Sequence, residues 1–101
     1  MSITVTVRFP VSDVAKAIAG LQENAETLEA VTVSAKTQGG IHHRFVSGDG
    51  EIMAINEWES AETFHGFFHE NAQIEAIMTS LGLSGPPTVT MYAPVEAPGA
   101  F

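Results

Sequence analysis

The side chains best suited to chemistry are a histidine and an asparagine that fall in neighbouring segments. His43 lies in residues 41–46, whereas Asn56 and Trp58 lie in residues 51–58. An imidazole titrates near neutral pH and can take a proton from a phenol or an activated carbon acid. An amide N–H can stabilise an oxyanion, and an indole ring can stack on a planar molecule. Together the three side chains would suit proton abstraction from a small aromatic substrate.

Each of these residues also has a structural interpretation that stays open on the sequence alone. His43 could be a core or interface histidine bonded to the backbone, Asn56 could hydrogen-bond at a strand end, and Trp58 could pack between sheet and helix. A small-molecule site needs a few polar groups in an apolar hollow. A cavity beside all three residues would therefore favour the chemical interpretation.

A second candidate is the pair His65 and His69, whose spacing of four residues can hold a divalent metal on one helix face. Glu62 and Glu70 lie nearby in the sequence, but neither is a certain third ligand. The pair falls opposite a stripe of phenylalanines. We therefore expect a solvated helix face there and no metal.

The elements that position these residues follow from the hydrophobic pattern. Strands are predicted where apolar residues recur at every second position, over residues 3–9, 41–46, 51–58 and 88–92. Apolar stripes at steps of three and four follow the first and third strands, with Ser12 and Ser60 as the expected N-caps. The first stripe predicts one long helix, or two short ones broken near Asn24, that ends before Gly39. The second stripe continues beyond Asn71.

This order predicts an α+β fold of the ferredoxin-like βαββαβ type, with a four-stranded antiparallel sheet and both helical regions on one face. Residues 1–93 are expected to form the domain, and residues 94–101 a C-terminal tail that is disordered or lies on a partner subunit. The hairpin has too many apolar residues for one side of the sheet: Ile41, Phe45, Val46, Ile52, Met53 and Ile55. We therefore expect an apolar uncovered face that joins two copies, sheet to sheet, in a symmetric homodimer.

The hairpin register decides which side chains meet. If Val46 lies opposite Glu51, His43 pairs with Ala54 and shares a sheet face with Asn56. The neighbouring histidine then faces the other way, so the two histidines cannot bind one metal together. A loop one residue longer or shorter would reverse the faces. The opposite wall of the predicted cleft is a stripe at helical spacing that could equally be core: Phe64, Phe67 and Phe68.

Composition excludes several classes of function. Among 101 residues, four Lys and Arg against twelve Asp and Glu give a formal net charge of −8, which disfavours nucleic acid and anionic membranes as partners. The absence of Cys removes disulfides, thiolate chemistry and Cys-based metal sites. Residues 1–8 do not have the pattern of a signal peptide, and no apolar run reaches membrane-spanning length. We therefore expect a cytoplasmic protein.

Several segments carry a family resemblance. Residues 56–64 (Asn-Glu-Trp-Glu-Ser-Ala-Glu-Thr-Phe) resemble the corresponding segment of dimeric α+β barrel proteins, especially the antibiotic biosynthesis monooxygenase-like family. Residues 42–45, 48–50 and 85–87 are similar to those of small actinobacterial-type members, most of which lack an assigned activity. In the family's polyketide oxygenases the cleft carries Asn, Trp and Tyr, and Phe64 stands where the Tyr would be expected.

The resemblance implies a cofactor-independent monooxygenase that acts on a small hydrophobic substrate, aromatic or enolisable. His43 would then deprotonate the substrate, Asn56 would steady the developing oxyanion and Trp58 would orient the ring. The family's haem-degrading branch has a Trp and a His at positions that resemble Phe67 and Ile77, which cannot ligate iron, so no haem or other cofactor is expected. An isomerase or cyclase with the same cleft, and a non-catalytic ligand-binding or stress-associated dimer, stay open as alternatives.

Overall fold

The computed structural model describes residues 2–69 and 71–101. Its strands are β1 (Ile3–Pro10), β2 (Gly40–Gly48), β3 (Glu51–Trp58) and β4 (Thr88–Tyr92). Helices α1 (Val14–Glu23) and α2 (Ala25–Thr37) connect β1 to β2, and α3 (Ala61–Phe68) and α4 (Ala72–Ser80) connect β3 to β4. The predicted order of elements is confirmed, and each helical region consists of two helices.

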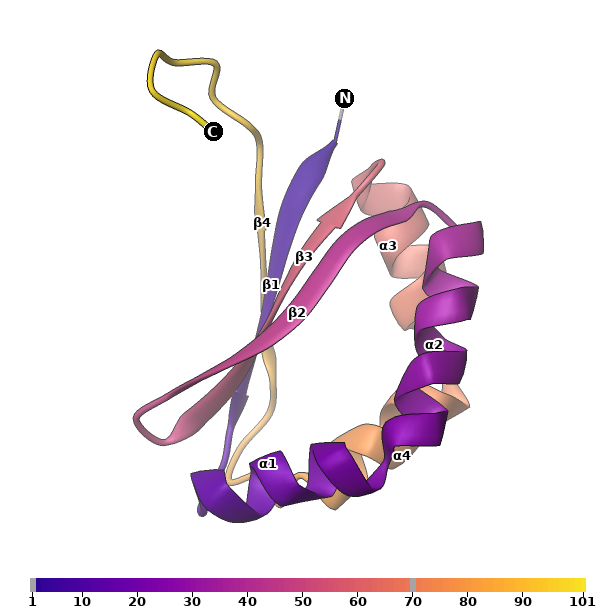
Figure 1. The fold of residues 1–101 in the computed structure, drawn as a ribbon, viewed down its shortest axis with the longest axis vertical. Helices are drawn as coiled ribbons and strands as arrows, with labels where there is room; N and C mark the ends of the chain where they lie inside the picture. The colour runs from indigo at the N-terminus through magenta and orange to yellow at the C-terminus, as the bar shows by residue number, and fades with distance from the viewer. Residues whose placement is uncertain (1, 70) are drawn as a thin grey trace.

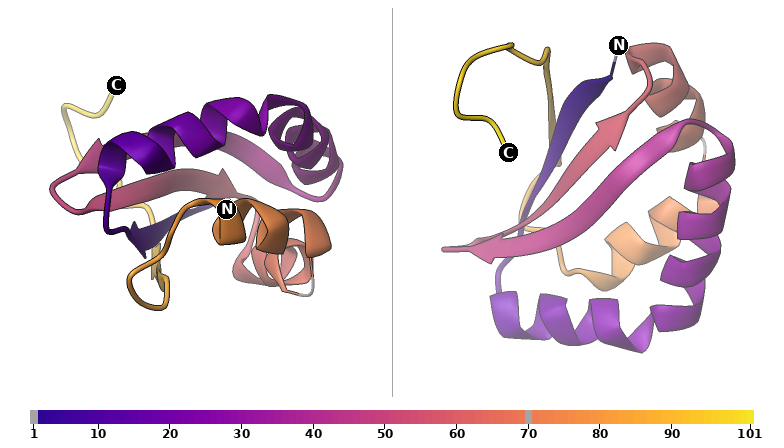
Figure 2. Two further views of the ribbon diagram at one scale, coloured as in Figure 1. Left: turned by 90° about the horizontal axis from the view of Figure 1, so that it is seen from below. Right: turned by 45° about the horizontal axis from the view of Figure 1, so that its top comes forward.

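The strands form one antiparallel sheet in the order β2-β3-β1-β4. The helices lie on the same side of this sheet, and the chain after β4 leads away from the helical layer (Figure 1; further views in Figure 2). This is the ferredoxin-like α+β fold that the sequence predicts. In the described part of the chain, no helix has both the length and the apolar character needed to cross a membrane.

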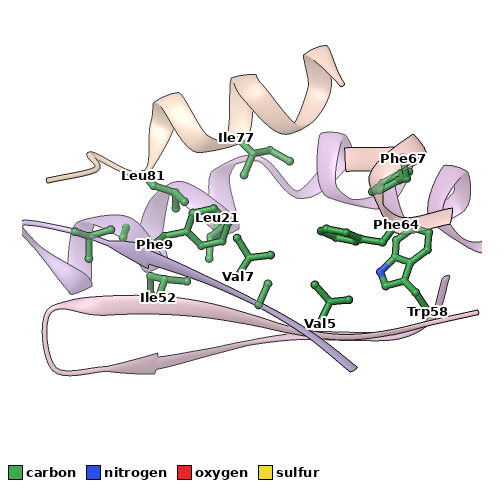
Figure 3. Packing of buried hydrophobic residues seen from close by; sticks show 13 residues of the cluster. Val5, Val7, Phe9, Leu21, Ile52, Trp58, Phe64, Phe67, Ile77 and Leu81 are labelled. Atoms are coloured by element: carbon green, nitrogen blue, oxygen red, sulfur yellow. The ribbon is translucent and has the colours of Figure 1, made fainter. Parts of the chain in front are cut away.

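The core lies between the sheet and the helices (Figure 3). Val5, Val7 and Ile52 point from the sheet toward the helical layer and are almost fully buried. The rest of the buried apolar cluster consists of Phe9, Val11, Ala17, Leu21, Ala54, Trp58, Phe64, Phe67, Ile77 and Leu81. Helix α2, every residue of which is described, contributes no fully buried side chain. It therefore covers the sheet without packing tightly onto it.

The N-cap predicted for α3 is confirmed, whereas the N-cap predicted for α1 has to be corrected. Ser60 caps α3 as predicted: its Oγ accepts from the Thr63 N–H, and the Thr63 Oγ1 accepts from the Ser60 N–H, each at 3.2 Å. The prediction of Ser12 as the cap of α1 is wrong. Asp13 is the cap, and its Oδ1 accepts from the Lys16 N–H at 3.1 Å. The helix begins one residue later than predicted, which moves the capping position onto the carboxylate.

The register predicted for the hairpin is also wrong, by two residues. Gly48, not Val46, lies opposite Glu51, and His43 lies opposite Asn56. The strands run on to a two-residue turn, in which a glycine adopts a φ of +70°. Such tight turns match the twist of paired strands, which explains why the longer loop does not form. Because a shift of two residues preserves the alternation, His43 and Asn56 share a sheet face as predicted.

The sheet face away from the helices is mixed, which corrects the expectation of an apolar face. Alternation with the buried positions puts on it Thr4, Thr6, Arg8, His42, Arg44, Val46, Met53, Ile55, Glu57, Thr88, Thr90 and Tyr92. The hairpin's apolar residues divide between the two faces: Ile52 is buried beneath the helices, whereas Met53 and Ile55 point away. Polar residues of β1 and β2 lie beside the apolar patch that remains.

Replacing Ser60 by Ala should lower the free energy of unfolding by about 1 kcal/mol, because the Thr63 N–H loses its acceptor at the start of α3. Ser12→Ala is the matched control and should change it by less than about 0.5 kcal/mol, because Ser12 is exposed and does not cap α1. Urea unfolding followed by circular dichroism measures both. Equal losses in the two variants would contradict the assignment of the caps.

Candidate active site

A cavity of about 500 Å³ lies between the helix-facing side of the sheet and the helices. Its size falls in the range of small-molecule sites. The space exists because α2 stands over it without burying a side chain. Its walls are largely apolar and include Val7, Phe9, Leu28, Val31, Ala35, Phe45, Ala54, Ile74, Ile77, Met78 and Leu81.

All six residues that the sequence singles out for the site line this cavity: His43, Asn56, Trp58, Phe64, Phe67 and Phe68. The register of β2 and β3 brings the first three together, and the helical spacing of α3 brings the phenylalanines over them. A cavity therefore lies beside His43, Asn56 and Trp58, and this favours the chemical interpretation of these residues over the structural one.

The aromatic rings form one packed end of the cavity. Trp58 meets Phe64 edge to face, with ring centroids 5.7 Å apart, and lies 5.0 Å from the ring of Phe67. Phe68 stacks on Phe64 at 5.1 Å. Figure 3 shows Trp58, Phe64 and Phe67 gathered together where β3 meets α3. Because Trp58 is only 3% exposed, its ring is both a packing anchor and part of the cavity wall.

The polar centre of the site is a hydrogen bond between His43 and Asn56. The His43 Nδ1 lies 2.6 Å from the Asn56 Oδ1, and the Asn56 Nδ2 donates to the Val5 carbonyl oxygen at 3.2 Å. A carbonyl oxygen can only accept, so the amide nitrogen must face Val5 and the amide oxygen must face His43. The His43 Nδ1 therefore carries the hydrogen. In the neutral ring, Nε2 is left with the free lone pair.

This geometry gives the two residues different capacities. His43 is largely exposed in this chain, and a base nitrogen within reach of a ligand can accept a proton. Asn56 is 8% exposed, and one of its two amide hydrogens is already donated to Val5. The oxyanion role predicted for Asn56 therefore has one amide hydrogen left to serve it.

Polar residues at one end of the cavity escaped the sequence analysis. Thr32 and Lys36 of α2 line it, as does His42 at the start of β2. An irregularity in the pairing between Gly40 and His42 inserts Ile41 there, so the strict alternation of the strand is interrupted. The available signal was the spacing of four residues between Thr32 and Lys36, which places them on one helix face.

The second candidate site lies outside the cavity. The His65 Nδ1 and the His69 Nε2 are 3.2 Å apart, and the two exposed rings stack. Within residues 2–69 and 71–101, no group of three or more His, Cys, Asp or Glu could hold a metal ion. Glu70, which the sequence places beside this pair, lies outside the described residues. The expectation of a solvated helix face agrees with the exposure of both histidines.

Structures that resemble this chain show which class of fold it has. The chain has the ferredoxin-like α+β fold of the antibiotic biosynthesis monooxygenase-like proteins, so the resemblance seen in the sequence is confirmed for the fold. No protein-family model and no curated protein matches the sequence itself.

Three solved structures illustrate this similarity. The monooxygenase ActVA-Orf6 of Streptomyces coelicolor, in complex with the ligand nanaomycin D, has a TM-score of 0.74 at 20% identity over 95% of this chain and 89% of that one. SnoaB, a cofactor-independent oxygenase from Streptomyces nogalater, has a TM-score of 0.64 at 13% identity over 98% of both chains. A dimeric ferredoxin-like protein from an uncultured marine organism has a TM-score of 0.71 at 10% identity over 95% and 90%.

The tautomer of His43 can be tested directly by long-range ¹H–¹⁵N NMR at a pH where the ring is neutral. The wild-type ring should carry its hydrogen on Nδ1, because the Asn56 Oδ1 accepts from it. In Asn56→Leu the acceptor is gone, and the ring should shift toward the Nε2–H form that is ordinarily favoured in water. The ring of His42 serves as an internal control and should not change. A wild-type His43 with its hydrogen on Nε2 would refute the assignment.

Proposed function

We propose that this protein is a cofactor-independent monooxygenase that acts on a small hydrophobic substrate, aromatic or enolisable, in the cavity. The observation that carries the proposal is the pair His43 and Asn56, which sets a base nitrogen at the edge of an aromatic-walled cavity. Two structurally similar proteins support the proposal: ActVA-Orf6 is a monooxygenase with nanaomycin D bound, and SnoaB is a cofactor-independent oxygenase.

In the proposed reaction, the His43 Nε2 takes the proton of a phenol, or of a C–H bond next to a carbonyl. The anion that results has a carbon atom rich enough in electrons to add to O₂. His43 returns its proton to the peroxide, which then loses water as the remaining C–H proton leaves. In sum, a phenol and O₂ give a quinone and water. The substrate supplies all four electrons, so the reaction requires no separate reductant.

Asn56 is proposed to act mainly through His43. By accepting from Nδ1–H it holds the imidazole in the tautomer that leaves Nε2 basic, and its own orientation is fixed by the bond to Val5. Its remaining amide hydrogen is available to the developing oxyanion, as the sequence analysis predicts. Trp58 and the phenylalanine rings would supply flat apolar walls that orient the substrate ring.

We also propose that two copies pair through the uncovered sheet face as a homodimer. The apolar patch of that face includes Met53 and Ile55, which are half-buried in the single chain. One of the solved structures with the same fold is that of a dimeric ferredoxin-like protein. The threonines around the patch can hydrogen-bond across an interface, so a mixed face does not oppose pairing.

Oxygen uptake with quinols and phenolic polyketides tests the proposed reaction. His43→Ala should lower the rate by about 100-fold or more, since a positioned general base contributes that much. His65→Ala is the matched control and should keep the wild-type rate, because His65 is exposed and does not line the cavity.

Equal uptake by wild type and His43→Ala would remove His43 as the base. Product that forms at the same rate without O₂ would instead identify an isomerase or cyclase. Binding of these compounds without turnover under either condition would leave a non-catalytic binding protein.

Sedimentation equilibrium tests the dimer. The wild type should have about twice the chain mass of 10.7 kDa. Ile55→Asp should give a monomer, because the interface would bury an unpaired charge. Val33→Asp is the control: Val33 is 66% exposed on α2, away from the sheet face, and its replacement should leave the mass unchanged. A wild-type monomer at micromolar concentration would overturn this part of the proposal.

A further inference from the structure

The charge balance of the cavity is opposite to that of the whole chain. The sequence has twelve Asp and Glu against four Lys and Arg. Yet among the described residues that line the cavity there is no carboxylate, whereas Lys36 is present together with His43. A cavity lined by a lysine and by no carboxylate, in a protein that is acidic as a whole, provides an environment suited to an anion.

Lys36 lies at the end of the cavity where α2 meets β2. It belongs to the last turn of α2, and the adjacent residue Ala35 lies against the start of β2: a Cβ added to Gly40 would come within 3.0 Å of the Ala35 carbonyl oxygen. From Gly40 to His43 the strand advances by two positions of β3, from Trp58 to Asn56, because Ile41 is an extra residue; at about 3.3 Å per residue this is about 7 Å. This distance is comparable with the length of a molecule of two fused rings.

The ammonium group of Lys36 is available to a ligand. Within residues 2–69 and 71–101, the ion pair that forms is Arg8 with Glu51 at 2.9 Å, and no described carboxylate lies within ion-pair distance of Lys36. Lys36 is exposed, so water screens its charge and an anion gains only modestly from it; the apolar walls beside it would supply the rest of the binding by holding the rings.

We infer that the cavity takes an aromatic acid whose anionic group binds Lys36 while its fused rings lie beside Trp58 and extend toward His43. The anionic group would be a carboxylate, a sulfonate or an ionised phenol. This inference rests on the proposed function insofar as the bound acid is taken to be the substrate. Lys36 is then a specificity-determining residue, because it fixes which end of the molecule faces the base.

A matched pair of fluorescent probes tests the inference without any assay of turnover. 1-Anilinonaphthalene-8-sulfonate carries a sulfonate, and N-phenyl-1-naphthylamine has the same rings without it. Lys36→Met, which keeps the length of the side chain and removes its charge, should weaken binding of the sulfonate probe about fivefold and leave the neutral probe unchanged. Lys36→Arg should restore binding of the sulfonate probe.

Lys16→Met is the control, since Lys16 is exposed on α1 and does not line the cavity; it should affect neither probe. If Lys36→Met changes both probes equally, or neither, the inference is wrong. This outcome is distinct from failure of the proposed function. A protein that binds the sulfonate probe through Lys36 but oxidises no phenol would keep the inference and lose the monooxygenase.

Discussion

The buried amide of Asn56 is the constraint on which the chemistry of this molecule depends. Among the described residues it is the polar side chain that lies in the core, and an unpaired buried amide would cost about 1–3 kcal/mol. Its nitrogen is satisfied by the Val5 carbonyl and its oxygen by His43. Satisfying the amide therefore determines which ring nitrogen of His43 is basic. A requirement of folding thus sets the reactive state of the site.

A second constraint is that the helical layer does not fill the space above the sheet. On β1 and β3 most helix-facing residues are buried, yet α2 buries no side chain and lines the cavity from Leu28 to Lys36. A core normally closes such gaps, because unfilled apolar space forfeits dispersion contacts. Here Trp58, Phe64 and Phe67 pack against one another and hold α3 over one end of the sheet. The hollow is thereby kept open beside His43.

Much of this arrangement can be predicted from the sequence. Alternating apolar residues locate the strands, and the capping box at Ser60 marks the start of α3. Pairing of His43 with Asn56 could not be predicted, because Gly48 and Gly50 allow loops of two or four residues. That His43 and Asn56 share a sheet face could be predicted, since the two-residue and the four-residue loop give the same alternation of faces. The position of Lys36 at the cavity could not be predicted, because lysines near helix C-termini usually face solvent and complement the helix dipole.

The cavity has two chemically different ends, and this polarity has a consequence for any ligand. Lys36 and His43 lie with Trp58 toward the end of the cavity where β2 begins, because Gly40 pairs with Trp58, whereas the far end is lined by uncharged residues such as Phe9 and Leu81. A molecule that is apolar throughout could bind in either direction, with its reactive atom near His43 in one and far from it in the other. A molecule with one anionic end loses that freedom. Orientation, more than affinity, is therefore what a single lysine in such a cavity can supply.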